Sequence, residues 1–150
     1  MRLVIQRVNE ASVSIAGAVH STIQKGFMVL IGIEQADTEE DAEWLAGKLI
    51  GLRIFDDEAG VMNRSVTDID GEVLVVSQFT LHALTKKGNR PSYIRAAGHE
   101  KAVPLYTLFC KLVSNKLGKE VKTGVFAADM QVALVNNGPV TILIDSKNKE

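Results

Sequence analysis

The sequence has 150 residues, of which 46% are hydrophobic and 23% are charged, and its formal net charge is -1. This length and composition predict a single globular domain, residues 1–150, with enough apolar side chains for one core. The charge balance excludes a global positive field for nucleic acid, so any such contact must come from a local patch.

Cysteine content and the N-terminal residues predict where the protein resides. The single Cys110 cannot form an internal disulfide, which fits a reducing compartment. The first residues lack the apolar stretch of a signal peptide, and the longest apolar run, 27–33, is far shorter than the roughly 20 residues of a membrane span. We therefore expect a cytoplasmic protein that does not contact a membrane.

The first half of the chain has the pattern of several strands and one helix. The expected strands are 3–8, 11–16, 19–24, 27–33, 53–55, 61–62 and 72–79. Asp37 or Thr38 can cap a helix that begins close behind them, with an acidic residue three positions further on. The apolar face of that helix is expected to consist of Ala42, Leu45, Leu49 and Leu52.

A second helix is expected to run to about Leu117, with Gly118 as its C-cap. Pro104 suits the first turn of a helix but would distort the interior of one that began at His99. Three further β segments are expected, at 121–123, 131–135 and 140–144. Strands outnumber helices, so the predicted fold class is α+β: a mostly antiparallel, barrel-like sheet with two packed helices.

The usual signs of side-chain catalysis are absent from the sequence. His20, His82 and His99 are widely separated and have no second ligand at metal-binding spacing. Cys110 lies among apolar residues of the second helix and is expected to be an inert core thiol. There is no glycine-rich phosphate loop of the usual kinds, so we predict neither a metal nor a cofactor.

Three stretches are not explained by core or surface roles alone. Ser77, Gln78 and Thr80 place hydrogen-bonding groups at the end of an apolar strand. Residues 86–95 hold four cations and no acid, which suits either phosphate contact and base stacking or an ordinary solvated loop. Residues 136–139, Asn-Asn-Gly-Pro, separate two β-type runs and are read either as a hairpin turn or as part of a site.

Taken together, these stretches resemble one protein family. The motifs are IQRV at 5–8, RIF at 53–55, VVSQFTL at 75–81, GNRPSY at 88–93 and TGVFAADMQVALVNNGPVT at 123–141. In this combination the sequence resembles the D-aminoacyl-tRNA deacylases from Met1 to Asp145. Tyr93 stands where the family often has Phe, and Pro104 is unusual in its helix. Residues 146–150 lie outside the pattern and are expected to form a flexible tail.

The resemblance implies a homodimer that hydrolyses the ester bond of D-aminoacyl-tRNA and releases the free D-amino acid and tRNA. It implies that the Gly138-Pro139 peptide is cis and enters the active site of the other subunit. There a backbone wall would leave room for hydrogen, but not for the side chain of an L residue. Glycyl-tRNA offers no side chain to reject and is a possible further substrate.

The resemblance also assigns roles to individual residues. The backbone amides of Phe79 and Thr80 would bind the oxyanion, with the 2′-hydroxyl of the terminal adenosine helping to activate water. The Thr80 hydroxyl is an alternative nucleophile, although no histidine is placed by motif to activate it. The remaining assignments are Ser77 and Gln78 for positioning the adenosine, Phe126, Ala128 and Met130 for its pocket, Arg7 and Asn136 for support of the Gly-Pro motif, and Lys86, Lys87 and Arg90 for tRNA phosphates.

Two alternatives remain open on the residues themselves. One is a non-catalytic module that binds single-stranded RNA through residues 86–95. The other is a structural homodimer or small-molecule-binding barrel in which residues 136–139 are only a turn. Neither the charge nor the motifs indicate DNA as a partner.

Overall fold

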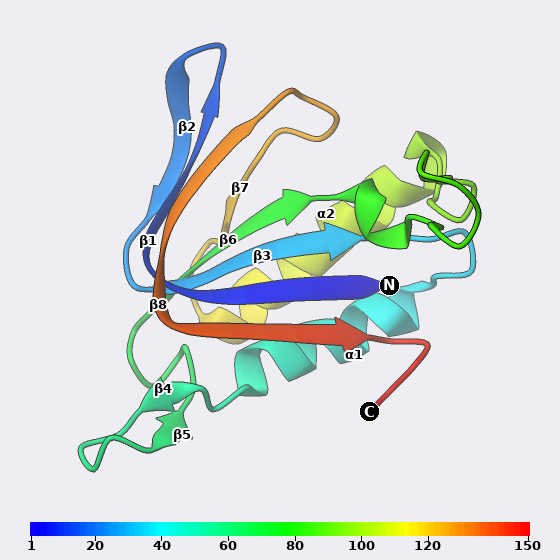
Figure 1. Ribbon diagram of the computed structural model, residues 1–150. Helices are drawn as coiled ribbons and strands as arrows, with labels where there is room; N and C mark the ends of the chain where they lie inside the picture. Colours follow the sequence, from blue (N-terminus) through cyan, green and yellow to red (C-terminus); the bar gives the residue numbers. More distant parts are fainter.

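A long first strand organises the sheet. In the computed structural model, which describes residues 1–150, β1 (Arg2–Ile15) pairs antiparallel with β2 (Ala18–Ile23), β3 (Gly26–Gly32) and β8 (Gln131–Asp145) (Figure 1). Its first half lies between β3 and β8, and its second half lies between β2 and β8. The two runs expected at 3–8 and 11–16 are therefore one strand, in which Val8 and Ala11 are both buried.

The far side of the sheet is parallel. β6 (Glu72–Ser77) pairs parallel with β3, and β7 (Lys122–Thr123) pairs parallel with β6. Parallel neighbours need a crossover. The first contains α1 (Glu39–Gly51) and the small hairpin of β4 (Phe55–Asp56) and β5 (Met62–Arg64), and the second contains α2 (His99–Leu117). The predicted α+β class with two helices is confirmed, with a parallel edge that the sequence pattern did not predict.

Both helices cover the same face of the sheet and pack against each other (Figure 1). α1 buries Ala42, Leu45, Ala46 and Leu49 completely, whereas Leu52 lies just beyond its end. Burial of one such leucine side chain contributes about 1.5–3 kcal/mol. Neither helix is long and apolar enough to cross a membrane.

α2 tolerates a proline in its second turn. The helix begins at His99, and Pro104 lies inside it on the exposed side. The carbonyl that loses its amide partner there is that of Glu100, in the exposed first turn of the helix. The helix ends at Leu117, and Gly118 follows with φ 79°, the left-handed conformation that the expected glycine C-cap requires.

The last two expected β segments are halves of one strand. Residues 131–135 and 140–144 both belong to β8 and both pair with β1, so the hairpin interpretation of residues 136–139 is wrong. Gln6 pairs with Thr141, and Val8 pairs with Asn136. Two steps along β1 therefore correspond to five along β8, and the extra residues bulge out of the strand as a turn.

The segment after β8 contacts the body of the protein at its beginning. Ser146 is buried and its amide donates to the Met1 carbonyl at 2.9 Å. Lys147 forms a 2.7 Å ion pair with Asp41. Partial burial would raise the pKa of Asp41, but hydrogen bonds from Lys147, Ser146 and Thr38 outweigh it and hold the pKa well below its usual range. Flexibility of the remaining tail stays a prediction.

Candidate active site

A hollow of about 640 Å³ opens at the ends of β3 and β6. Most of its lining is hydrophobic, 13 of 17 residues, as is typical of ligand sites. Six of the predicted site residues share this lining: Ser77, Gln78, Phe79, Phe126, Ala128 and Met130. The structure thus brings together the polar end of one strand and a segment about 50 residues later in the chain.

One wall of the hollow is the η1 turn, the name used here for Gln78–His82. β6 ends at Ser77, Gln78 caps the turn, and η1 (Phe79–His82) is a short 3-10 helix. The hydrogen bonds of the turn begin with the Leu81 amide, which donates to the Gln78 carbonyl at 3.3 Å. Phe79 and Thr80, as the first helical residues, carry amides with no partner inside the turn. Two free donors at the edge of a pocket suit an anionic oxygen.

The Thr80 side chain is occupied by a neighbour. Its hydroxyl accepts a hydrogen bond from Gln78 Nε2 at 2.5 Å, and Thr80 does not line the hollow. The imidazole in the same turn, His82, is buried and directs Nδ1 toward Glu34 Oε2 at 4.0 Å. Neither ring nitrogen of His82 has a hydrogen-bond partner. The turn therefore provides no base for the Thr80 hydroxyl.

The opposite wall is aromatic. The Phe126 ring meets His99 edge-on at 5.2 Å and Tyr106 at 5.8 Å between centroids. The Tyr106 hydroxyl donates to the Val75 carbonyl at 2.9 Å, which ties α2 to β6 beneath the hollow. Burial raises the pKa of Tyr106 above its usual range, so the hydroxyl remains a donor. Burial also raises the pKa of Cys110 to about 12, which agrees with an inert thiol.

Aromatic side chains also stand at the mouth of the hollow. Phe79 is 56% exposed and meets Tyr93 edge-on, with centroids 5.1 Å apart. Tyr93 and His99 line the same hollow, although sequence reasoning assigned neither a role there. Their signal was weak, since a single aromatic residue in a loop has no periodicity to mark it.

The predicted Gly-Pro motif lies elsewhere. The Gly-Pro turn, Asn137–Val140, contains a cis Gly138-Pro139 peptide, and neither residue lines the hollow. Gly138 has φ 128°, which an L residue rarely adopts, and an added Cβ would lie 2.9 Å from Val140 Cγ2. Both residues are exposed.

A buried arginine holds this turn. Arg7 Nε donates to the Asn137 carbonyl at 2.9 Å, and Nη1 donates to the Ile54 carbonyl at 2.6 Å. The side chain of Asn137 bonds to Asn9 at 3.0 Å, whereas that of Asn136 is exposed and forms no hydrogen bond. Support for the turn thus comes from Arg7 and Asn137.

The basic loop, Lys86–Arg95, lies beside the hollow. None of its cations lines the hollow. Lys86, Lys87 and Arg90 are exposed and have no ion-pair partner. Backbone bonds between Leu84 and Ser92 close the loop at its base, at 2.8 and 3.0 Å. Three unpaired cations on a closed loop are available for phosphate oxygens.

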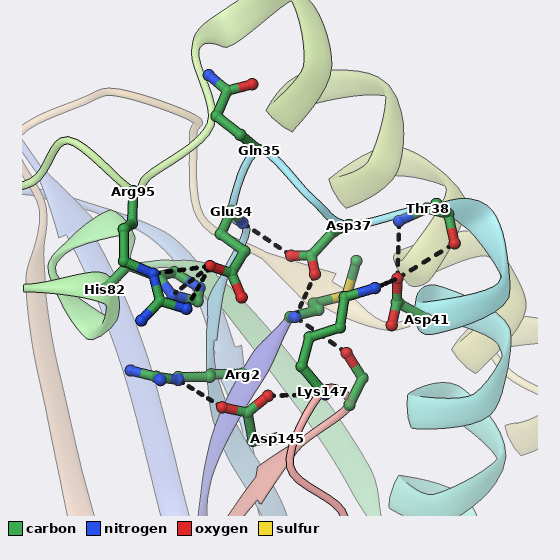
Figure 2. Close-up of polar contacts among 12 residues, drawn as sticks. Arg2, Glu34, Gln35, Asp37, Thr38, Asp41, His82, Arg95, Asp145 and Lys147 are labelled. Atoms are coloured by element: carbon green, nitrogen blue, oxygen red, sulfur yellow. Dashed lines mark hydrogen bonds and ion pairs between the residues drawn. The ribbon is translucent and has the colours of Figure 1, made fainter.

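A charged cluster behind the η1 turn was not predicted (Figure 2). Glu34 is buried and its Oε2 accepts from Arg95 Nη2 at 2.7 Å, on the side that faces His82. Arg2 Nε donates to Asp145 Oδ2 at 2.7 Å. These partners are 61 and 143 residues apart in sequence, so no local pattern could indicate them. No cluster of three histidine, cysteine or acidic side chains suited to a metal ion is present.

A mixed sheet with a hollow at its strand ends, walled by aromatic rings and free backbone amides, defines an α+β domain with a ligand site. Comparison with known proteins gives the family. A sequence model described as D-Tyr-tRNA(Tyr) deacylase matches residues 4–145. The chain therefore belongs to the D-Tyr-tRNA(Tyr) deacylase family, and the prediction of a hydrolase acting on D-aminoacyl-tRNA is confirmed at the level of the family.

Individual relatives are similar in sequence to this chain over its whole length. Proteins called D-aminoacyl-tRNA deacylase from Phocaeicola vulgatus and Flavobacterium johnsoniae are 66% and 59% identical over 150 residues, covering 100% of this chain and of each relative. A solved structure of a c-Myc DNA unwinding element binding protein has a TM-score of 0.92 at 40% identity and covers 97% of this chain and 98% of its own. A probable eukaryotic D-amino acid tRNA deacylase, at 17% identity and a TM-score of 0.80 over 95% of this chain and 97% of its own, shares the fold.

Proposed function

We propose that the protein hydrolyses the ester bond of D-aminoacyl-tRNA at the hollow beside the η1 turn and releases the D-amino acid and tRNA. The observation that carries this proposal is the free amide of Phe79 at an aromatic pocket, with the free amide of Thr80 next to it in the η1 turn. A volume of about 640 Å³ lies within the range of about 300–1,000 Å³ for small-ligand sites. A terminal adenosine between Ser77, Gln78 and the wall of Phe126, Ala128 and Met130 would bring its ester to those amides.

The proposed chemistry uses the backbone amides of the η1 turn. Attack of water on the ester carbonyl makes a tetrahedral oxyanion, and preorganised backbone amides stabilise such a charge without a side-chain acid. The Thr80 hydroxyl is bonded to Gln78 and has no base in its turn, which favours water over Thr80 as the nucleophile. We infer that the 2′-hydroxyl of the terminal adenosine helps to activate that water.

Chiral selection requires a second subunit in this proposal. The Gly-Pro turn is exposed on β8 and does not reach the hollow of its own chain. β8 pairs only with β1, and its outward face exposes Val135 and Leu143, at 47% and 74%. A long unpaired edge with apolar side chains favours coverage by a second copy. In a two-fold dimer each Gly-Pro turn would enter the other subunit's hollow and exclude an L side chain.

The basic loop would contact the tRNA near its 3′ end. Lys86, Lys87 and Arg90 are exposed, unpaired cations beside a pocket mouth that carries Phe79 and Tyr93. Cations bind phosphates without regard to sequence, and aromatic faces stack on unpaired bases. Glycyl-tRNA would pass a wall that acts only on side chains, so we propose it as a further substrate.

Deacylation of matched D-tyrosyl- and L-tyrosyl-tRNA tests this function. We expect rapid hydrolysis of the D ester, little of the L ester, and measurable hydrolysis of glycyl-tRNA. Equal rates for the two enantiomers would refute chiral selection, and no hydrolysis of either would refute the deacylase.

A second candidate is a protein that only binds single-stranded nucleic acid. The solved relative at 40% identity is called a DNA unwinding element binding protein, and the basic loop suits any phosphate backbone. A single-stranded DNA competitor separates the two ideas. Under the deacylase proposal it displaces tRNA only weakly and is not itself changed.

A further inference from the structure

The η1 turn is held against β3 from its inner side. The Gln78 amide donates to the Ile31 carbonyl at 2.8 Å and extends the pairing of β6 with β3 past its end. At Gly32 an added Cβ would lie 2.8 Å from Leu81 Cβ and 3.0 Å from the Gln78 carbonyl oxygen. The turn therefore lies directly on the backbone of β3, and it cannot move inward.

One side chain holds the turn from the other end. Arg2 Nη1 donates to the Leu81 carbonyl at 2.9 Å, and its Nε donates to Asp145 Oδ2 at 2.7 Å. A guanidinium group suits this task because its donors are fixed in one plane and can bind two acceptors at once. The carbonyls that end a helical turn lack a partner within it, so Arg2 supplies a partner that the turn needs.

The Asp145 carboxylate remains ionised near neutral pH. Partial burial would raise the pKa of Asp145, but the hydrogen bond and the charge of Arg2 outweigh it and lower the pKa. Figure 2 shows the two side chains facing each other below the cluster of Glu34, Arg95 and His82. Asp145 thus fixes the orientation in which Arg2 Nη1 donates to the Leu81 carbonyl.

We propose that Arg2 is a positioning residue for the deacylation reaction. By binding the Leu81 carbonyl it fixes the peptide planes of the η1 turn, and so the direction of the Phe79 and Thr80 amides. Arg2 lines a different hollow, between α1 and β8, and is absent from the lining of the candidate active site. Its effect is therefore transmitted through Leu81 and not by contact with the substrate. This inference rests on the proposed role of the two amides.

The experiment compares Arg2→Ala with a matched control on the same protein. Arg64 Nη2 donates to the Asp68 carbonyl at 2.5 Å in the exposed region of β5, so Arg64→Ala removes the same kind of bond far from the site. Single-turnover hydrolysis of D-tyrosyl-tRNA should be about ten- to a hundredfold slower in Arg2→Ala, because small misplacements of catalytic groups cost that much. The half-saturating enzyme concentration should stay within about twofold of wild type, and Arg64→Ala should match wild type in both.

Three further measurements distinguish positioning from general destabilisation. Amide hydrogen exchange in the peptide 78–83 should accelerate in Arg2→Ala but not in Arg64→Ala. Added guanidinium at millimolar concentration should restore part of the lost rate. Arg2→Lys keeps the charge but cannot bind two acceptors in the same plane, so it should recover less than full activity.

The possible results distinguish a failure of the positioning role from a failure of the proposed function. An Arg2→Ala rate within about twofold of Arg64→Ala, or a loss that follows the unfolded fraction in thermal melts, would overturn the positioning role while the deacylase stands. A raised half-saturating concentration with an unchanged maximal rate would also overturn it, since Arg2 would then act in binding. A wild-type protein without hydrolysis of either enantiomer would remove the proposed function, and this inference with it.

Discussion

The η1 turn and the Gly-Pro turn are both short, irregular segments, the first directly after β6 and the second within β8. Different contacts hold the two turns in place. The η1 turn lies on β3, contains the buried His82 and has its Leu81 carbonyl bonded to Arg2. The Gly-Pro turn bulges from an edge strand, and Arg7 holds it through the Asn137 carbonyl at 2.9 Å. Under the proposed function, the turn that supplies fixed donors is held inside the subunit, whereas the turn that would enter the other subunit is exposed on an edge strand.

The largest effect should come from removing the 2′-hydroxyl of the substrate. If the η1 turn supplies only backbone donors, activation of water depends on the RNA, and a terminal 2′-deoxyadenosine should slow hydrolysis about a hundred- to ten-thousandfold. Thr80→Ala keeps the amide and should reduce the rate only modestly with D selectivity intact. An inactive Thr80→Ala with normal hydrolysis of the deoxy substrate would instead make Thr80 the nucleophile.

The second effect tests the proposed role of the Gly-Pro turn in excluding L side chains from the other subunit's hollow. Gly138→Ala places a Cβ at φ 128°, 3.0 Å from the Val140 nitrogen, so the turn must shift. We expect the ratio of D to L hydrolysis to fall about ten- to a hundredfold while the fold and the proposed dimer persist. Gly17→Ala is the control, because Gly17 also has a positive φ, 80°, but has no neighbour within 4 Å of the added Cβ. Sedimentation showing a fully active, selective monomer would contradict the cross-subunit role.

The two regions also differ in how far the sequence predicted them. The strand end at Ser77 and Gln78 and the segment with Gly138 and Pro139 were visible as local patterns, but only the resemblance to a family gave them roles. The burial of α1 followed from its 3-and-4 spacing. The continuity of β8 was not, because Asn-Gly between two β runs has the signal of a hairpin. Arg2 and Glu34 had no signal at all, and Arg95 was grouped with the loop cations although it pairs with Glu34. The partners of these residues lie far away in the chain, and only the tertiary fold brings them together.

A third measurement tests whether the basic loop binds tRNA independently of the η1 turn and the Gly-Pro turn. Replacing Lys86, Lys87 and Arg90 by Ala should weaken tRNA binding and lower the slope of log affinity against log salt by roughly 0.7 for each phosphate that the loop no longer neutralises. The rate on bound ester should change little, because the three cations do not line the hollow. Replacing Lys111 and Lys116, two exposed lysines of α2, by Ala provides a control for loss of positive charge elsewhere on the surface. An unchanged salt slope with a collapsed single-turnover rate would place the loop in the catalytic centre.

The smallest effect concerns the pH dependence of stability at the η1 turn. Burial lowers the pKa of His82, although the Gly32 backbone and the nearby Glu34 carboxylate oppose this. The neutral imidazole is thus favoured in the folded state, and the unfolded chain takes up a proton as pH falls below about 6.5. The free energy of unfolding should therefore decrease between pH 7 and 5 through His82. The carboxylates with lowered pKa, Asp41, Asp57, Asp68 and Asp145, lose their contribution only below about pH 4.

His82→Leu removes this titration and replaces an imidazole whose nitrogens lack partners with an apolar group. Urea unfolding at pH 7 and pH 5 should show a smaller difference in the variant than in wild type, with little loss at pH 7. His20→Leu, at an exposed position on β2, should keep the wild-type difference. No comparable change is expected from the Gly-Pro turn, which contains no titratable side chain. If His82→Leu retained the full decrease toward pH 5, the buried imidazole would not be its source, and the acid sensitivity would have to come from the charged groups around Glu34.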